Sequence, residues 1–310
     1  MRILIALGGN AMTAPGGRAR PEDQIAAIGL AARRIAAVVA DGHEVAVTHG
    51  NGPQVGNLLV KNEIAASVVP PVPLDWCGAQ TQGTVGFVLL NALQRSLAEI
   101  GAERPVGAVV TRTLVDAGDP AFARPTKPIG RYLPADEAKV MVEHGQSWED
   151  RGDPGWRRVV ASPEPLEVLD APAVAALLAA GFVVVGAGGG GVPVARDEDG
   201  TLRGVEAVID KDLAAAVLGR TLGAELLVIA TDVDHVAVHF GTPDQRPLGR
   251  LGVAELRRYA REGHFGSGSM GPKVEAACRF VEAGGRRTVI TSLDRITSAV
   301  AGAAGTVVER

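Results

Sequence analysis

Short apolar runs alternate with longer stretches of helical periodicity along most of the chain. Residues 3–7 form an apolar run that ends at Gly8 and Gly9, and residues 24–40 then place apolar side chains at helical spacing. By the same criteria we expect strands at residues 3–7, 44–48, 106–115, 182–185, 205–209, 225–230 and 289–292, and helices at 24–40, 80–100, 173–180, 212–222, 253–262 and 273–283. Short buried strands that alternate with helices are typical of βαβ units. The pattern therefore predicts an α/β fold, a three-layer sandwich whose central sheet is mostly parallel and has helices on both faces.

The pattern breaks between residues 116 and 165. This segment is rich in proline, glycine and charge, and it holds Trp148 and Trp156, two of the three tryptophans. We interpret residues 116–165 as a small protruding subdomain inserted into a single domain of residues 1–310. The regular pattern resumes at Leu166, where we expect the two halves of the domain to meet.

Composition indicates a soluble globular protein. Of the 310 residues 46% are hydrophobic, and the formal net charge is -4. There is no long basic block, so we expect no nucleic-acid partner. Residues 171–195 carry no charge and are long enough to cross a membrane, but prolines and glycines interrupt them, so we expect no membrane segment.

The two cysteines, Cys77 and Cys278, lie far apart and lack the paired spacing of a zinc or redox motif. Both lie in apolar contexts, so we expect buried side chains in a reducing cytoplasm. The N-terminal apolar run is too short for a signal peptide, which agrees with a cytoplasmic location.

Lysine is rare in this sequence. Of 31 basic residues only five are lysines, and Lys61 and Lys139 lie in polar helix contexts, where we expect solvated side chains. Lys211 lies between two aspartates at the start of a predicted helix, Lys273 follows a glycine-serine loop, and Lys127 lies in a loop framed by prolines. Lysine is a compact, mobile point charge, whereas arginine is a rigid fork. Three such charges around one anion would suit phosphoryl transfer, which depends on positioning and cationic stabilisation. A chance distribution of five lysines is the alternative.

Glycine-rich loops follow three predicted strands, at residues 8–10, 50–52 and 188–191. Glycine lets backbone N–H groups approach a phosphate closely, and in an open parallel sheet ligands bind beyond the carboxyl ends of the strands. None of the loops matches the dinucleotide fingerprint or the lysine-containing phosphate loop. The loops predict an anion site, with ordinary tight turns as the alternative.

Six motifs together resemble one family. They are LGGN (7–10), THGNGPQVGN (48–57), PTKPIG (125–130), GGGGVP (188–193), GVEAVIDKD (204–212) and GSMGPK (268–273). In this order, and over essentially the whole chain, they resemble the carbamate kinases, which have the amino acid kinase fold. The segment around Lys127 is similar to the insertion that distinguishes carbamate kinases from acetylglutamate, aspartate and uridylate kinases.

The resemblance implies reversible phosphoryl transfer between ATP and carbamate, with the N-terminal half on the substrate side and residues 166–310 on the nucleotide side. The substrate and the transferring phosphoryl group would bind at the first two glycine loops, at Gly8, Gly9, Asn10, Gly50, Asn51 and Gly52. The catalytic groups would be three lysines and the aspartate that orients them, Lys127, Lys211, Lys273 and Asp212. The nucleotide would lie against two further segments, at Thr231, Asp232, Val233, Ser269 and Met270.

The resemblance also implies cofactors and partners. The cofactors would be ATP or ADP and Mg2+, with the metal bound mainly by phosphates and water and by no protein ligand. The other partners would be carbamate, carbamoyl phosphate and a second copy of the chain in a homodimer. A role in arginine metabolism follows from the same resemblance.

Carbamate is already an anion and needs no general base, so we expect His49 to fix the Asn51 loop instead of acting in catalysis. Two departures from the family concern the nucleotide side. Gly266 and Ser267 stand where the family often has Ala-Pro, and His235 stands where an aromatic is common. The alternative functions are another carboxylate kinase of the same fold, similar to acetylglutamate kinase, and a non-catalytic anion-binding homologue.

Overall fold

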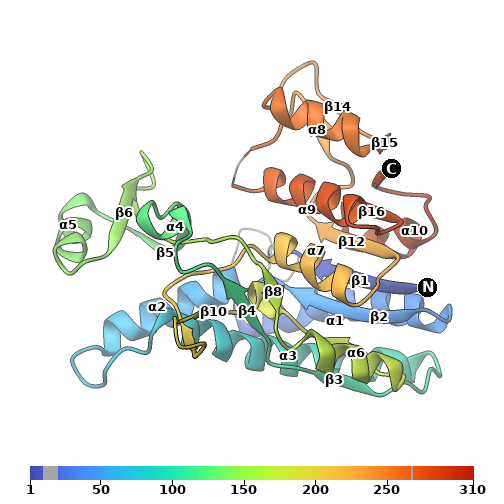
Figure 1. Cartoon of the computed structure of the whole chain (residues 1–310), viewed down its shortest axis with the longest axis horizontal. Coiled ribbons are helices and arrows are strands. Elements are labelled where there is room, and N and C mark those ends of the chain that lie inside the picture. Colours follow the sequence, from blue (N-terminus) through green and yellow to red (C-terminus); the bar gives the residue numbers. More distant parts are fainter. Residues whose placement is uncertain (10–19, 267) are drawn as a thin grey trace.

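A central sheet lies between two layers of helices (Figure 1). The computed structural model describes residues 1–9, 20–266 and 268–310. Within these ranges the largest sheet has eight strands, in the order β15 (Arg250–Gly252), β17 (Thr306–Glu309), β16 (Arg287–Ser292), β12 (Leu226–Thr231), β1 (Arg2–Leu7), β2 (Glu44–His49), β9 (Val183–Val185) and β3 (Val106–Ala108). Only β16 and β17 pair in antiparallel orientation in this sheet, as far as the described residues show. The predicted α/β sandwich with a mostly parallel sheet is confirmed.

Alternate side chains of the central strands divide the core into two parts. On β1, Ile3, Ile5 and Leu7 face one core, and Leu4 and Ala6 face the other. The first core packs against α1 (Pro21–Ala40), α3 (Leu74–Glu99) and α10 (Ile296–Val300). The second packs against α6 (Ala171–Ala179), α7 (Lys211–Thr221), α8 (Val253–Arg261) and α9 (Met270–Glu282). Strands buried on both faces appear in the sequence as continuous apolar runs, which is why they could be predicted.

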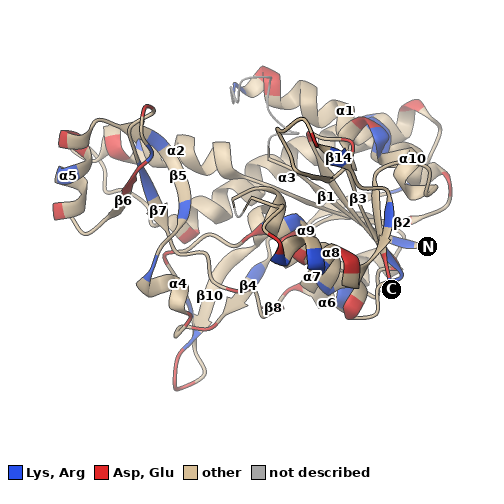
Figure 2. Cartoon of the chain, turned by 90° about the horizontal axis from the view of Figure 1, so that it is seen from above, with Lys and Arg blue, Asp and Glu red and all other residues tan. Residues whose placement is uncertain are grey.

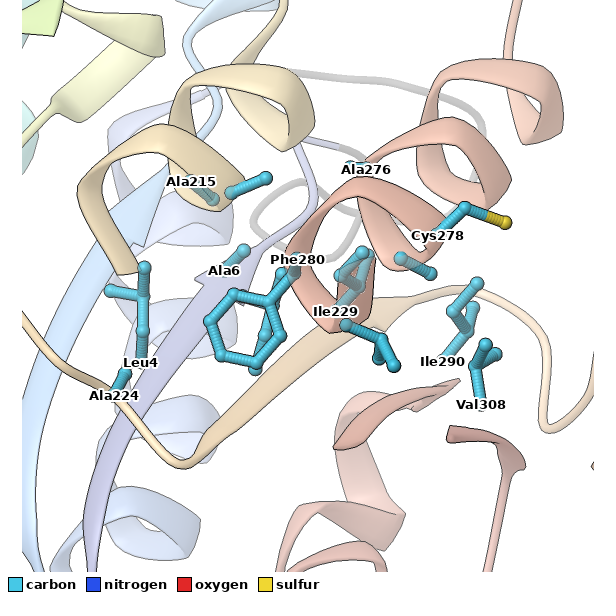
Figure 3. Packing of buried hydrophobic residues seen from close by; sticks show 14 of the residues in the cluster. Leu4, Ala6, Ala215, Ala224, Ile229, Ala276, Cys278, Phe280, Ile290 and Val308 are labelled. Atoms are coloured by element: carbon cyan, nitrogen blue, oxygen red, sulfur yellow. The ribbon is translucent and has the colours of Figure 1, made fainter. Parts of the chain in front are cut away.

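Phe280 of α9 sets how closely α7 and α9 approach. Its ring is buried next to Leu4 in the second core (Figure 3). A methyl group at Gly219 of α7 would lie 2.8 Å from the ring, and one at Gly285 would overlap it. The absence of side chains at these two glycines therefore lets the ring pack against backbone. The helices that carry Lys211 and Lys273 are held side by side in consequence.

Smaller sheets lie beside the main one. One contains β11 (Leu202–Gly204), β10 (Val192–Arg196), β4 (Arg112–Val115) and β8 (Glu167–Val168), and a short ribbon pairs β13 (Ala237–Val238) with β14 (Arg246–Pro247). Between β4 and β8 the chain forms a three-stranded sheet of β5 (Lys127–Leu133), β7 (Trp156–Val160) and β6 (Ser147–Asp150), with the helices α4 (Pro120–Ala123) and α5 (Ala135–Glu143). In Figure 1 this sheet and α5 project from one end of the molecule.

The single strand expected at residues 106–115 is wrong. The chain forms β3 in the main sheet, leaves it, and forms β4 in the second sheet. At the crossing, Thr111 is buried and its backbone bonds to a side chain: Thr111 N donates to Gln82 Oε1 at 2.8 Å, and Gln82 Nε2 donates to Thr111 O at 3.0 Å. The Gln82 amide thus satisfies backbone groups that a continuous strand would have paired.

The strand expected at residues 205–209 is also wrong. These residues are extended, but only Ala207 makes a bridge, to Ala161. The predicted helix at 273–283 begins earlier, at Met270, so that Lys273 lies in its first turn. The helical context expected for Lys61 is confirmed by α2 (Gly52–Ala65), but the bounds of this helix were not predicted; it begins with Pro53 in its first turn, a favoured position for proline.

Residues 171–195 fold as the glycines suggested. They form α6, β9, a short 3-10 turn at Gly188–Gly190 and the start of β10. No helix among the described residues is long and apolar enough to cross a membrane. Cys77 and Cys278 are buried and unpaired, as predicted.

Candidate active site

A cavity of about 1040 Å³ lies at the carboxyl ends of the central strands. Strand register brings Leu7 of β1 next to His49 of β2 and Ala230 of β12, so the loops that follow these strands meet at one edge of the sheet. The cavity is lined by the predicted loop residues Gly8, Gly9, Gly50, Asn51, Gly52 and Gly189. Across from them it is lined by residues of β5 and by residues 151, 157 and 162.

The first two glycine loops touch each other. Gly50 N donates to Leu7 O at 2.9 Å, and a methyl group at Gly50 would lie 2.8 Å from Gly9 N. Asn51 is held from α3, because its Nδ2 donates to Thr81 Oγ1 at 2.9 Å. Gly189 has φ +66°, and a side chain there would overlap the Asn51 amide. Close contact with the Gly9 backbone explains the glycine at position 50, and contact with the Asn51 amide together with the positive φ explains the one at position 189.

His49 lies beneath this loop. Its ring is buried, and Nδ1 lies 2.9 Å from Gly50 O. A carbonyl oxygen only accepts, so Nδ1 carries the proton. Burial lowers the pKa of His49 to about 4, the Gly50 hydrogen bond opposes part of this effect, and the charge of Lys211 adds a smaller lowering. His49 is therefore neutral at pH 7 and supports the loop at Gly50, the residue before Asn51.

Three lysines from distant parts of the chain converge on two aspartates. Lys127 Nζ lies 2.8 Å from Asp210 Oδ2, and Lys211 Nζ bonds to Asp212 Oδ1. Lys273 Nζ lies 3.1 Å from Asp212 Oδ2 and 3.3 Å from Ser269 O. All five side chains line the cavity. The arrangement presents three ammonium groups to one space.

Asp210 has a second role at this point. Its Oδ1 accepts from Asp212 N at 2.9 Å and so caps the N-terminus of α7. Burial would raise the pKa of Asp210, but the charge and hydrogen bond of Lys127, with Lys211 nearby, lower it below its ordinary value. Asp210 is thus held ionised while it caps the helix and binds Lys127.

Lys211 is the most enclosed of the three lysines, with a side chain 12% exposed, against 15% for Lys273 and 33% for Lys127. Burial lowers the pKa of Lys211, the Asp212 carboxylate acts in the opposite direction, and the charge of Lys273 adds to the lowering. Its Cδ would lie 3.3 Å from a methyl group at Gly50. Lys211 therefore connects the lysine cluster to the glycine loops.

The predicted nucleotide residues divide into two groups. Thr231 and Ser269 line the cavity, whereas Asp232, Val233 and Met270 are outside the set of described residues that line it. Thr231 Oγ1 donates to Asp232 Oδ1 at 3.0 Å. Asn10 lies outside the described residues, as does Ser267.

Other residues of the cavity were not predicted as site residues. Asp210 had a signal, its place next to Lys211. Arg131, Arg151 and Arg157 line the cavity from the segment 116–165. No sequence signal separates these three from the many other arginines of the chain.

Comparison with known proteins identifies the family. The sequence profile of the amino acid kinase family matches residues 1–292. Carbamate kinase from Thermococcus kodakarensis is 48% identical over 315 residues, which span 100% of this chain and 99% of that protein. The chain belongs to the carbamate kinases of the amino acid kinase family.

Carbamate kinase from Pyrococcus furiosus is 44% identical, over 98% of each chain. A solved carbamate kinase from Giardia lamblia, bound to AMP-PNP, matches with a TM-score of 0.93 and 38% identity, over 99% of this chain and 98% of that one. Membership of the carbamate kinase family makes this chain a phosphotransferase. The converging lysines are the part of the structure that suits this chemistry.

Proposed function

We propose that the chain transfers a phosphoryl group reversibly between ATP and carbamate, to give ADP and carbamoyl phosphate. The observation that carries the proposal is the meeting of Lys127, Lys211 and Lys273 next to the glycine loops. Charge spreads over the three equatorial oxygens of a transferring phosphoryl group, and nearby cations stabilise it. Relatives named carbamate kinase span the whole chain, which supports this substrate over N-acetylglutamate.

The reaction needs no covalent intermediate. A carboxylate oxygen of carbamate forms the new bond to the γ-phosphorus while the bond to the β,γ-bridging oxygen breaks, and ADP leaves with that oxygen and its electron pair. Carbamate is an anion, so no proton has to be removed first. His49, neutral and bonded to Gly50, is not needed as a base.

We assign the substrate to the first two glycine loops and the nucleotide to the side of Thr231 and Ser269. Gly8, Gly9 and Asn10 would hold the phosphoryl group, and Gly50, Asn51 and Gly52 the carbamate. Lys211 and Lys273 would neutralise the phosphates, with Asp212 orienting both. Asp232, Val233 and Met270 would contact the nucleotide after a rearrangement, since they do not line the cavity. The Giardia relative is bound to AMP-PNP, which supports binding of a nucleotide by this chain.

The donor set agrees with a magnesium ion bound through the phosphates. Among the described residues, no three histidines, cysteines or carboxylates group as metal ligands, and both acidic residues of the cavity are paired with lysines. Mg2+ keeps several waters and binds substrate phosphates readily. When bound, it would neutralise charge on the phosphate chain, while the lysines orient the reacting group.

Residues 116–165 would act as a movable lid that brings Lys127 to the substrate, with residues 166–310 forming the nucleotide side. We further propose a cytoplasmic homodimer that acts on small molecules in arginine metabolism. These proposals rest on the family.

The test is ATP formation from ADP and carbamoyl phosphate. Carbamoyl phosphate is a mixed anhydride and the stronger phosphoryl donor, so this direction is favourable. Lys127→Ala should lower kcat about 100-fold, since the loss of one positioned donor costs ~3 kcal/mol in such sites. The matched control is Lys139→Ala, an exposed lysine of α5 in the same segment, which should keep normal activity.

Two results would reject the proposal. One is turnover of N-acetylglutamate in preference to carbamate, which would indicate another carboxylate kinase. The other is folded protein without ADP-dependent consumption of carbamoyl phosphate, which would indicate a non-catalytic anion-binding protein.

A further inference from the structure

The cavity continues past the lysine cluster beneath the three-stranded sheet. We call this part the annex, and it is lined by Asn57, Val60, Arg131, Arg151 and Arg157. The first two residues belong to α2, and the arginines come from β5, from the turn after β6 and from β7. In Figure 2 basic residues mark β5 and β7 at this end of the molecule.

The charge of the cavity is opposite to that of the chain. Among the described residues, six cationic and two acidic side chains line it, although the net charge is -4. A recess lined by one sign of charge concentrates ions of the other sign and speeds their arrival. The annex therefore favours anions, the class to which the proposed substrates belong.

Carboxylates neutralise most of these cations. The lysines pair with Asp210 and Asp212, Arg131 Nε lies 3.3 Å from Glu63 Oε2, and Arg151 Nη2 lies 2.6 Å from Glu149 Oε2. Among the described residues Arg157 has no carboxylate oxygen within 4.0 Å. Glu149 is paired with Arg157 across β6 and β7, but its carboxylate binds Arg151 instead, so Arg157 is left without an ion pair.

Tyr132 holds Arg157 without neutralising it. The guanidinium carbon of Arg157 lies 5.0 Å from the centre of the Tyr132 ring, and Nη1 donates to the Tyr132 hydroxyl at 3.3 Å. An aromatic face attracts a cation while leaving its charge available to a ligand. The Arg157 Nε is buried and has no acceptor in the described part of the chain. The Arg157 guanidinium is thus oriented by Tyr132 but keeps N–H groups that have no hydrogen-bond acceptor among the described residues.

Arg157 and Lys127 leave the three-stranded sheet at different points along it. Lys127 pairs with Val160 of β7, and Arg157 precedes Val160 by three residues, which corresponds to about 10 Å along a strand. This backbone separation leaves room for a second oxyanion position beside that of Lys127.

We propose that Arg157, stacked on Tyr132, forms a second oxyanion site in the annex, which takes the phosphate group of carbamoyl phosphate before it reaches the lysines. The planar guanidinium matches two oxygens of a phosphate. This inference rests on the proposed function for its substrate. The site itself would bind inorganic phosphate equally well.

The first experiment needs no turnover. Equilibrium dialysis with inorganic phosphate should give two phosphates per chain for the wild type and one for Arg157→Gln. The matched control is Arg158→Gln, because Arg158 is the next residue on β7, lies outside the cavity lining and approaches Glu206 at 3.8 Å. The control should retain two phosphates. Equal stoichiometry in the wild type and Arg157→Gln would overturn the site.

The second experiment asks whether the site serves the reaction. At low ionic strength Arg157→Gln should lower kcat/KM for carbamoyl phosphate about tenfold, the smaller end of electrostatic steering, and the difference should shrink as salt is added. The KM for ADP and kcat at saturating carbamoyl phosphate should stay within twofold of the wild type. Arg157→Lys should restore part of the salt-dependent rate, because it keeps the charge but not the fork.

The results separate the two proposals. Absence of turnover by the wild type would reject the proposed function. The number of phosphates bound per chain would still show whether the Arg157 site exists. A lowered kcat in Arg157→Gln, with normal kcat/KM for carbamoyl phosphate at low salt, would overturn the arrival role. Thermal unfolding of each variant ensures that only folded protein is compared.

Discussion

Replacement of Lys211 by arginine separates charge from shape in the candidate site. The change retains one positive charge but replaces a mobile ammonium by a planar fork that is bulkier at its end. Lys211 is nearly enclosed, with 12% of its side chain exposed. If the shape of this residue matters, Lys211→Arg should behave as a loss of function despite its charge.

The magnitude follows from the packing. The Lys211 Cδ lies 3.3 Å from the position of a methyl group at Gly50, and that position is 2.8 Å from Gly9 N, so the stem runs close to both loops. Its partner Asp212 is 3% exposed and also binds Lys273 at 3.1 Å, which leaves little room for a fork. Overpacking a filled site costs about 1–3 kcal/mol, and losing one positioned donor costs about 3–4 kcal/mol in the transition state. We expect kcat to fall 100- to 1000-fold.

The assay is ATP formation from ADP and carbamoyl phosphate, measured for the wild type, Lys211→Arg and Lys211→Met. Lys211→Arg should resemble Lys211→Met in kcat. Lys61→Arg, at an exposed position on α2, controls for the exchange itself and should be unchanged. A kcat of Lys211→Arg within threefold of the wild type, in folded protein, would refute the argument from shape and leave only charge.

Two further predictions concern the loops next to Lys211. Gly189→Ala should lower activity at least tenfold, because the new methyl group overlaps the Asn51 amide at a φ of +66°; Gly200→Ala, with φ +87° and open space around it, should reproduce the backbone strain but keep the activity. Normal activity in both variants would contradict the role of Asn51. The second prediction is that the free energy of unfolding falls between pH 6.5 and 4, because burial holds the pKa of His49 at about 4 in the folded state, below its ordinary 6.5. A lowered pKa gives stability that is complete above pH 6.5 and lost as the pH falls towards 4, so His49→Gln should flatten this part of the profile in urea unfolding, and an unchanged slope would exclude His49 as its source.

The sequence predicted those strands whose burial is complete. β1, β2, β9, β12 and β16 are apolar runs with abrupt ends, and each was expected within about two residues. The failures at residues 106–115 and 205–209 have one cause. An apolar extended segment shows that backbone is buried, but not which sheet, or which side chain such as Gln82, satisfies its hydrogen bonds.

Helix starts were harder to predict than strands. The helix α2, whose start was not predicted, contains Gly52 and Gly56, and glycine lowers helix propensity by about 1 kcal/mol relative to alanine. A methyl group at Gly56 would lie 3.4 Å from Gly130 Cα, so the glycine allows β5 to approach α2 closely. This is a tertiary reason that local propensity does not contain.

Site residues could be predicted where composition gave contrast. Lysine is scarce, so Lys127, Lys211 and Lys273 stood out, and the structure brings their ammonium groups to adjacent aspartates. Arginine is abundant, so nothing in the sequence distinguished Arg157 from the other arginines. Its distinction is the lack of an ion pair among the described residues, which is a property of the fold.

The run Asp210-Lys211-Asp212 links the stability of a helix to the position of the lysines. One oxygen of Asp210 caps α7 at Asp212 N, and the other binds Lys127 from β5. The cap fixes the direction in which Lys211 and Asp212 leave the first turn, and Asp212 then binds Lys273 from α9. Each of the two carboxylates thus positions a lysine from another part of the chain: Asp210 positions Lys127, and Asp212 positions Lys273. The same Asp210 side chain caps the N-terminus of α7 and binds Lys127. Displacement of the segment that carries Lys127 would remove this charge partner, but the hydrogen bond from Asp212 N to Asp210 would remain. The N-terminus of α7 would therefore stay formed if the proposed lid carried Lys127 away from Asp210.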